Sequence, residues 1–371
     1  MPLPRLGVPG QTPAMLKRRV VLAAGSAGLV ASTSFAQGSE RIETLLAELM
    51  HKRRVPDASL AVIRGGAIAE RVAVSAGERT LFQAASISKV VTAITVMRLV
   101  EQGRIGLDTP VNERLRSWTL PGPGAERVTP RLLLSHRAGA TVAGFPGYAV
   151  GARLPTLAEI LDGTPPANTR GVRVAWPPGE AFRYSGGGTM VLQRLAMDVA
   201  AQDFAALAGE LALAPIGMSR SGFFQPLPAS ESNWATAYDL DGNPLAGRYH
   251  VYPEHAAAGL WSTSSDLARL ALAIAASWRS GGLLKQATAE LMATRVATGP
   301  TGLGLFVHPR DGKPPYLYHY GVNAGFRSIL VFAADASFGV ALMTNGEGGK
   351  PLIPAMLAAL FEGQDPFRPA N

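Results

Sequence analysis

The distribution of apolar and polar positions predicts strands near both ends of the chain. Residues 58–64 and 68–75 are rich in apolar and β-branched side chains, and Gly65-Gly66 between them is typical of an antiparallel hairpin. Four more short strands are predicted at residues 304–307, 316–319, 328–332 and 339–343. We therefore expect one antiparallel sheet built from both ends of the chain.

Helical spacing of apolar residues dominates the rest of the chain. Helices are predicted at residues 39–53, 129–135, 155–162, 187–201, 203–213, 264–280, 285–294 and 352–362. The fold class is thus α/β in the broad α+β sense, with helices flanking the sheet and a mostly helical lobe at about 104–300. Residues 221–258 carry six aromatic residues among polar, Gly and Pro positions, and we expect this long irregular segment to wall a binding cleft.

Composition excludes several classes of protein. The chain has 371 residues, of which 47% are hydrophobic and 17% charged, as in an ordinary globular protein. It has no cysteine, which excludes disulfides, a thiol nucleophile and a Cys-based metal site. The net charge is +8, but no basic block with interleaved aromatic residues occurs, so we expect no nucleic-acid partner.

Half of the excess positive charge lies in residues 1–36, which have the pattern of an export signal. Lys17-Arg18-Arg19 precedes a short apolar run at residues 20–31, and Ser34-Phe35-Ala36 is a small-x-small cleavage site that would leave Gln37 first. The arginine pair admits the twin-arginine route, Met15 is an alternative start, and a retained anchor is the alternative to cleavage. The mature protein is expected to be periplasmic or secreted, without a stable membrane span.

A possible nucleophile lies in Ser86-Ile87-Ser88-Lys89, directly before an apolar run with helical spacing. This position predicts that Ser86 lies in the first turn of a helix, where Lys89 shares its face and its ammonium can reach the Ser86 hydroxyl. A lysine beside a serine can take its proton, and helix N–H groups can stabilise an oxyanion. The alternative is a surface helix capped by a serine.

Two further positions carry candidate chemistry. Tyr184 precedes Ser185-Gly186-Gly187-Gly188, and tight glycine turns can present its hydroxyl as a general acid or base, especially if cations lower its pKa. His319 ends a predicted strand two residues before Gly321, which lets another backbone approach closely, and the histidine can carry charge or donate a hydrogen bond. A packed tyrosine and a structural histidine are the alternatives.

Taken together, these three positions resemble the penicillin-recognising serine hydrolases, which include class C β-lactamases, soluble DD-peptidases and related esterases. That family orders its motifs as Ser-x-x-Lys, Tyr-x-Asn and Lys-or-His-x-Gly. The likeness extends from about residue 40 to 361 and includes further blocks at residues 132–139, 178–180, 258–268 and 323–326.

The resemblance implies a β-lactamase/transpeptidase-like fold and an acyl-enzyme mechanism without a cofactor. Ser86 would be the nucleophile, with Lys89 and Tyr184 sharing proton transfer. The oxyanion would lie between the N–H groups of Ser86 and Val322, next to Gly321, while His319 would keep the cleft positive. The substrate would be a small ester, amide or peptidoglycan-like compound.

Two departures from the family pattern affect the expected substrate. Gly186 stands where the family has Asn, and His319 stands where class C β-lactamases have lysine. Both favour an esterase, or a peptidase acting on D-amino-acid compounds, over an efficient β-lactamase.

The rival hypotheses are a metal hydrolase, an α/β-hydrolase and a non-catalytic binding protein of the same fold. His250, Glu254 and His255 fit no helical zinc motif because Pro253 interrupts any helix, and no Gly-x-Ser-x-Gly occurs. The complete Ser/Lys/Tyr set argues against a non-catalytic protein. We therefore expect a signal peptide at 1–36 and one hydrolase domain at 37–371.

Overall fold

The computed structural model describes residues 26–361, with side chains from Gly38 onward. Contacts divide the chain into Met1–Gly38 and Ser39–Asn371, and the account below concerns the second unit. The predicted signal peptide lies outside the described residues, except for helical backbone that belongs to α1 (Ser26–Arg53).

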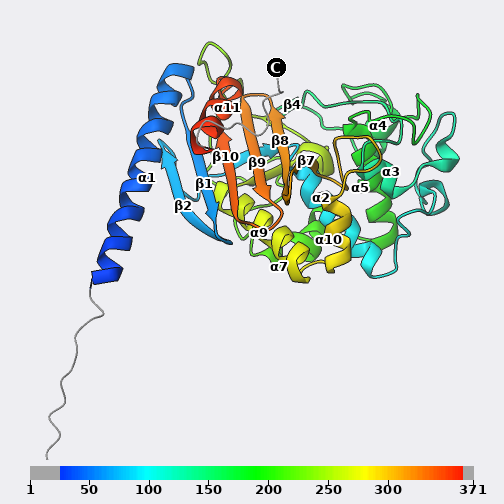
Figure 1. Cartoon of the computed structure of the whole chain (residues 1–371). Helices are drawn as coiled ribbons and strands as arrows, with labels where there is room; N and C mark the ends of the chain where they lie inside the picture. Colours follow the sequence, from blue (N-terminus) through cyan, green and yellow to red (C-terminus); the bar gives the residue numbers. More distant parts are fainter. Residues whose placement is uncertain (1–25, 362–371) are drawn as a thin grey trace, which may run out of the picture. The chain divides into compact units, whose positions relative to one another are not determined.

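The expected antiparallel sheet is confirmed, and it contains strands from both ends of the chain (Figure 1). Its strands follow the order β2-β1-β10-β9-β8-β7. The central pair joins β1 to β10, with Leu60 opposite Leu342. The strands are β1 (Ala58–Arg64), β2 (Ala67–Val74), β7 (Phe306–Arg310), β8 (Lys313–Asn323), β9 (Phe326–Ala333) and β10 (Phe338–Thr344).

The central strands of the sheet are buried on both faces. Side chains of alternate residues point to opposite faces, and each face packs against a different layer. Leu60 and Val62 belong to the cluster that includes residues of α1 and of α11 (Gly349–Leu360). Ala61 and Ile63 face the opposite layer, where α9 (Ser264–Ser280) contacts the sheet. Each fully buried Leu, Ile or Val stabilises the fold by about 1.5–3 kcal/mol relative to an exposed one.

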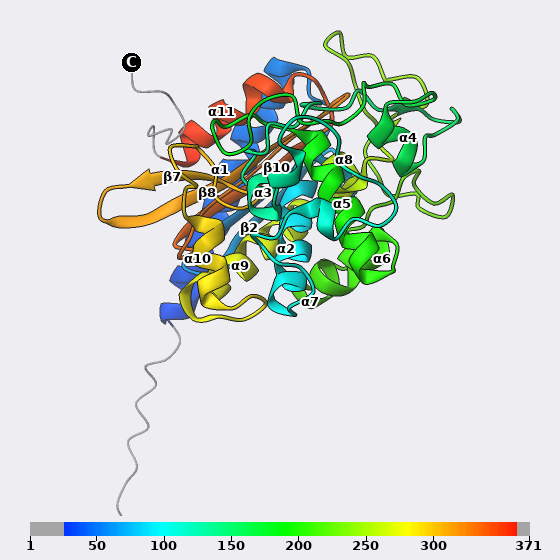
Figure 2. The ribbon, with the colours of Figure 1, turned by 90° about the vertical axis from the view of Figure 1, so that its right-hand side faces the viewer.

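The lobe between the two groups of strands is mostly helical, as predicted. Helix α2 lies within it and contacts α5 and α8, and Figure 2 shows α2 and α5 in front of the sheet. The remaining helices are α2 (Ser88–Glu101), α3 (Pro130–Leu134), α4 (Leu157–Asp162), α5 (Gly186–Ala200), α6 (Phe204–Ala208), α7 (Ala214–Ile216), α8 (His255–Ala258) and α10 (Gln286–Ala293). Short 3-10 turns occur at Val111–Glu113 and Ala125–Arg127.

One predicted helix differs from the observed structure. Residues 203–213 do not form one α-helix, because α6 gives way to a π-helical turn at Gly209–Leu213. Pro215 follows this turn and has no N–H to donate to the carbonyl of Leu211, which favours a local change in helix type.

Small two-stranded sheets complete the lobe. They pair β3 (Phe82–Ala85) with β6 (Leu260–Ser262), and β4 (Tyr148–Ala149) with β5 (His250–Val251). Within residues 26–361, no single helix is long and apolar enough to cross a membrane. One pair bent by 86°, Gly186–Ala200 with Phe204–Ile216, passes that test on length and composition only.

Candidate active site

Ser86 lies in a sharp turn between β3 and α2. The pairing of β3 with β6 is irregular between Gln83 and Ala85, and Ala85 has a left-handed backbone with φ of 51°. Ser88 Oγ fixes this turn by donating to the Ala85 carbonyl (2.6 Å) and accepting from the Leu260 N–H (3.0 Å). Ser86 is therefore in the turn before the helix, two residues earlier than the first α2 residue.

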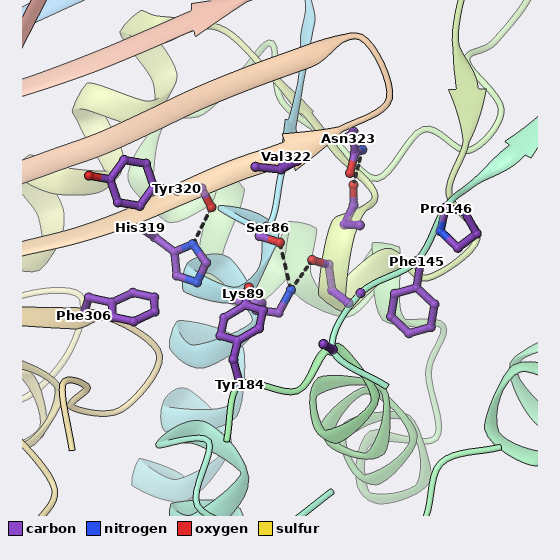
Figure 3. A pocket seen from close by; sticks show the side chains of 14 residues that line it. Ser86, Lys89, Phe145, Pro146, Tyr184, Phe306, His319, Tyr320, Val322 and Asn323 are labelled. Carbon is purple, nitrogen blue, oxygen red and sulfur yellow. Dashed lines mark hydrogen bonds between the residues drawn. The ribbon is translucent and has the colours of Figure 1, made fainter. Parts of the chain in front are cut away.

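Lys89 reaches Ser86 as the spacing predicted. Its Nζ lies 3.1 Å from Ser86 Oγ and 2.7 Å from the carbonyl of Ala257 in α8 (Figure 3). The Lys89 side chain is buried, whereas Ser86 is partly exposed to the cavity. The amine is thus held against the hydroxyl by a second, fixed acceptor.

Tyr184 lies beside this pair. Lys89 Nζ is 5.2 Å from the centroid of the Tyr184 ring. Ser185, the residue after it, caps α5 because its Oγ accepts from the Gly188 N–H (2.8 Å) and donates to the Thr141 carbonyl (2.7 Å). The capped helix end fixes the backbone from which the tyrosine projects.

His136 holds the backbone on both sides of Tyr184 and packs against its ring, a role that the sequence did not reveal. Its carbonyl accepts the Arg183 N–H (2.7 Å), and its Nδ1 accepts the Ser185 N–H (3.3 Å). Its ring centroid is 4.4 Å from that of Tyr184. Burial, together with the charge of Lys89, lowers the pKa of His136 well below its usual range, so the ring is neutral and Nδ1 can accept. His136 was visible in the block at residues 132–139, but nothing local indicated what it contacts.

His319 lies on β8 and faces the cavity (Figure 3). Its Nδ1 lies 2.7 Å from the Tyr320 carbonyl, which can only accept, so Nδ1 carries the proton. Burial and the charge of Lys89 lower the pKa of His319 to about 3. The expectation that His319 keeps the cleft positive is therefore wrong, because a histidine this desolvated stays neutral.

Gly321 lets β8 approach β3, as expected. A Cβ at this position would lie 2.3 Å from the carbonyl oxygen of Ala84 and 2.0 Å from Ser328 Oγ. Only a glycine therefore permits this separation between the strand and the backbone that leads into Ser86.

Val322 lies on β8, opposite Arg327 of β9. Val322 and Ser86 line the same cavity (Figure 3), and the oxyanion role of their N–H groups stays a prediction.

The cavity has a volume of about 670 Å³. Its walls come from the start of α2, a loop at residues 143–146, the end of α8, and strands β7 and β8. The lining residues are Ser86, Lys89, Ala143, Gly144, Phe145, Pro146, Tyr184, Ala257, Ala258, Phe306, His319, Tyr320, Val322 and Asn323.

The expectation that residues 221–258 wall this cavity is largely wrong. Only Ala257 and Ala258 of that segment line it, while Phe223, Tyr249 and Tyr252 are buried in the protein core. The wall is supplied instead by Phe145 and Pro146, which the sequence analysis missed. Their only local signal was a Gly-Phe-Pro-Gly loop.

The glycine at position 186, where the second motif of the resembled family has Asn, leaves room for the Phe145 ring. A Cβ at Gly186 would lie 2.9 Å from Phe145 Cε2 and 3.2 Å from the Ala143 carbonyl oxygen. The phenylalanine ring thus occupies space that a side chain at position 186 would need.

Among residues 38–361, no three His, Asp or Glu side chains gather in a way that could hold a metal ion. Glu254 is fully buried, and neither of its carboxyl oxygens has a hydrogen-bond partner among the described residues.

Comparison with known proteins agrees with this geometry. The sequence model of the family described as Beta-lactamase matches residues 42–363. The chain belongs to the beta-lactamase family. It is therefore a serine hydrolase.

Relatives within the beta-lactamase family differ in their names. "Penicillin-binding protein 4" of Amycolatopsis lactamdurans is 27% identical over 340 residues, which cover 84% of this chain and 85% of the relative. "Esterase EstB" of Burkholderia gladioli is 28% identical over 235 residues, or 55% of each chain. The structure of D-amino acid amidase from Ochrobactrum anthropi SV3 shares the fold, with a TM-score of 0.67, 21% identity, and coverage of 86% of this chain and 97% of the amidase.

Proposed function

We propose that this protein hydrolyses small ester or amide substrates through an acyl-enzyme on Ser86. The observation that carries the proposal is the Lys89 Nζ, 3.1 Å from Ser86 Oγ, at a cavity that Tyr184 and Val322 also line. The names of the esterase and of the penicillin-binding relative support hydrolysis or acylation at a carbonyl.

Acylation begins when Ser86 Oγ attacks the substrate carbonyl carbon and its proton passes to Lys89 or Tyr184. The resulting oxyanion accepts hydrogen bonds from the N–H groups of Ser86 and Val322, and each such donor contributes about 3 kcal/mol to transition-state stabilisation. The bond to the leaving group then breaks, and Tyr184 gives that group a proton. Water next attacks the acyl carbon and gives its proton to Tyr184. The bond between the acyl carbon and Ser86 Oγ then breaks, Oγ takes a proton back from Tyr184 or Lys89, and the acid departs.

The test uses the full chain and Ser86→Ala with p-nitrophenyl acetate, a D-amino-acid amide and a chromogenic cephalosporin. We expect turnover of the ester or the amide, slower turnover of the cephalosporin, and a loss of kcat of about a thousandfold or more in the variant. Mass spectrometry should find a fluorophosphonate adduct on Ser86. Full activity in Ser86→Ala would exclude the proposed nucleophile.

A non-catalytic penicillin-binding protein is the second candidate, favoured by the name of the Amycolatopsis relative. The same experiment distinguishes this binding protein from the hydrolase. A labelled penicillin would form a lasting adduct at Ser86, and neither the ester, the amide nor the cephalosporin would turn over.

We also propose that the protein is exported and acts in the periplasm or outside the cell. The support is the sequence of residues 1–36, with its basic start, apolar run and cleavage site. After expression in a Gram-negative host, the intact mass of the protein from the periplasmic fraction or the culture medium should correspond to a chain that begins at Gln37. Uncleaved protein found only in the cytoplasm would contradict export.

A further inference from the structure

Two of the polar side chains that line the cavity, Lys89 and Asn323, are bonded to other parts of the protein. Lys89 is the single lysine or arginine that lines the cavity among the described residues, and its Nζ is bound by Ser86 Oγ and the Ala257 carbonyl. Asn323 Nδ2 donates to Gln83 Oε1 (2.7 Å) and to the Ala258 carbonyl (3.2 Å). Both Asn323 Nδ2 hydrogens are thus in use, and so are two of the three Lys89 ammonium hydrogens, while the third remains beside Ser86 at the reacting carbonyl.

His319, which lines the cavity, gives it no positive charge. Because its proton lies on Nδ1, the neutral ring has a bare Nε2, and this buried atom has no partner among the described residues. A bare imidazole nitrogen accepts hydrogen bonds and repels a carboxylate. The third motif therefore provides no counterion for an anionic substrate group.

The rest of the cavity is apolar on two opposite sides. Figure 3 shows Phe145 and Pro146 on one side of Ser86 and Lys89, with Phe306 and Tyr320 on the other. Tyr318, which does not line the cavity, links the two rings of this second wall, since its ring centroid is 5.2 Å from that of Phe306 and 5.8 Å from that of Tyr320. An apolar group on the substrate gains contact with either wall, whereas a charged group there loses water without gaining a partner.

We propose that this cavity selects substrates whose scissile carbonyl carries an uncharged, apolar acyl group, that it discriminates against a carboxylate on that group, and that Phe145 is a specificity-determining residue. This inference rests on the proposed function, because it assumes that Ser86 is acylated. It adds the substrate class that the departures at Gly186 and His319 left open.

The discriminating substrates are p-nitrophenyl hexanoate and mono-p-nitrophenyl adipate, with p-nitrophenyl acetate as the reference. Hexanoate and adipate esters share the leaving group and chain length, so they differ mainly in the terminal carboxylate. After correction for their hydrolysis by hydroxide, we expect kcat/KM for the hexanoate to exceed that for the adipate by about a hundredfold or more.

Substitutions at the cavity test which residues cause this selectivity between the esters. Phe145→Ala should lower the ratio of hexanoate to acetate kcat/KM by about tenfold, and Phe145→Leu should lower it less, because leucine retains part of the apolar contact. Val322→Lys places a cation at the cavity rim, where the side chain is 59% exposed, and should raise the adipate rate relative to the hexanoate rate severalfold. Leu240→Lys makes the same charge change at a residue outside the cavity and should leave the ratio unaltered.

The outcomes separate this inference from the proposed function. Ser86-dependent turnover with equal rates on adipate and hexanoate would overturn the inference and leave the hydrolase intact. An unchanged hexanoate-to-acetate ratio in a folded Phe145→Ala would remove Phe145 as the determinant. If no ester turns over and Ser86 takes no fluorophosphonate, both proposals fail.

Discussion

At the scale of single residues, the site depends on side chains that hold other side chains. His136 binds the amides on both sides of Tyr184 and contacts its ring, although it does not line the main cavity. Its left-handed backbone, with φ of 54°, allows it to make these contacts. We therefore interpret His136 as a positioning residue for Tyr184.

His136→Ala should lower kcat by about ten- to a hundredfold with little change in KM, because a misplaced Tyr184 affects proton transfer more than binding. His136→Asn should retain more activity than alanine, since asparagine tolerates the left-handed backbone and its Oδ1 can accept from Ser185. Steady-state kinetics at matched folded fractions check this order. If both variants lose activity only in proportion to unfolding, His136 has a purely structural role.

Glu254 predicts a pH dependence of stability. Burial raises the pKa of this carboxyl from 4.5 to about 8. The folded state therefore holds a proton that the unfolded state releases above pH 4.5, and the protein loses stability as pH rises from 4.5 through about 8. Glu254→Gln lacks this loss, so its stability advantage should grow by about 1.4 kcal/mol per pH unit across that window.

Urea unfolding of both proteins at pH 5, 7 and 8.5 measures this advantage. The free-energy difference should be smallest at pH 5 and should level off above pH 8. An equal difference at all three values would show that the Glu254 carboxyl is paired or solvated in the folded protein.

At the scale of elements, the distance between β3 and β8 determines whether Ser86 and Val322 can act on one carbonyl. Gly321 sets that distance, because its missing side chain leaves room for the Ala84 carbonyl. Neighbouring strand pairs are held by their own hydrogen bonds, so an added methyl group must displace backbone.

Gly321→Ala should lower kcat/KM by about a hundredfold or more, because a shift of about 1 Å is enough to spoil the alignment of reacting groups. Gly209→Ala is the matched control, since nothing lies within 4 Å of a Cβ at that position. Both variants need their melting temperatures measured. Retained activity in Gly321→Ala would mean that Val322 does not contribute an oxyanion donor.

At the scale of the whole domain, the two faces of the sheet divide stability from catalysis. Leu342 is fully buried in the cluster with α1 and α11, on the face opposite the layer that contains α2. The site residues project from the other layer or from the strand edge. Loss of packing on the first face should therefore affect folding more than chemistry.

Leu342→Ala should reduce the free energy of unfolding by about 2–5 kcal/mol while kcat/KM per folded molecule stays within about twofold of wild type. Urea unfolding and kinetics at 15 °C measure the two quantities on the same preparation. A large drop in kcat/KM of the folded variant would show that the two faces are coupled.

Local pattern was sufficient to predict the strands, most helices and the meeting of Ser86 with Lys89, since those features depend on periodicity and short spacing. The bonds of His136, the neutral state of His319 and the Phe145 wall depend on contacts between distant segments. Burial of His319, for example, comes from neighbours on other elements, and no residue beside it in sequence indicates that its charge is suppressed.

The pairing of β1 with β10 has a consequence for the order in which the protein matures. Leu60 meets Leu342, so the middle of the sheet cannot close until nearly the entire chain has left the ribosome. A nascent chain that ends before residue 313 already contains Ser86, Lys89 and Tyr184, but it lacks the strand that supplies His319 and the Val322 N–H. The serine, lysine and tyrosine of the site are therefore synthesised early, whereas the strand that completes the cavity around them is synthesised late.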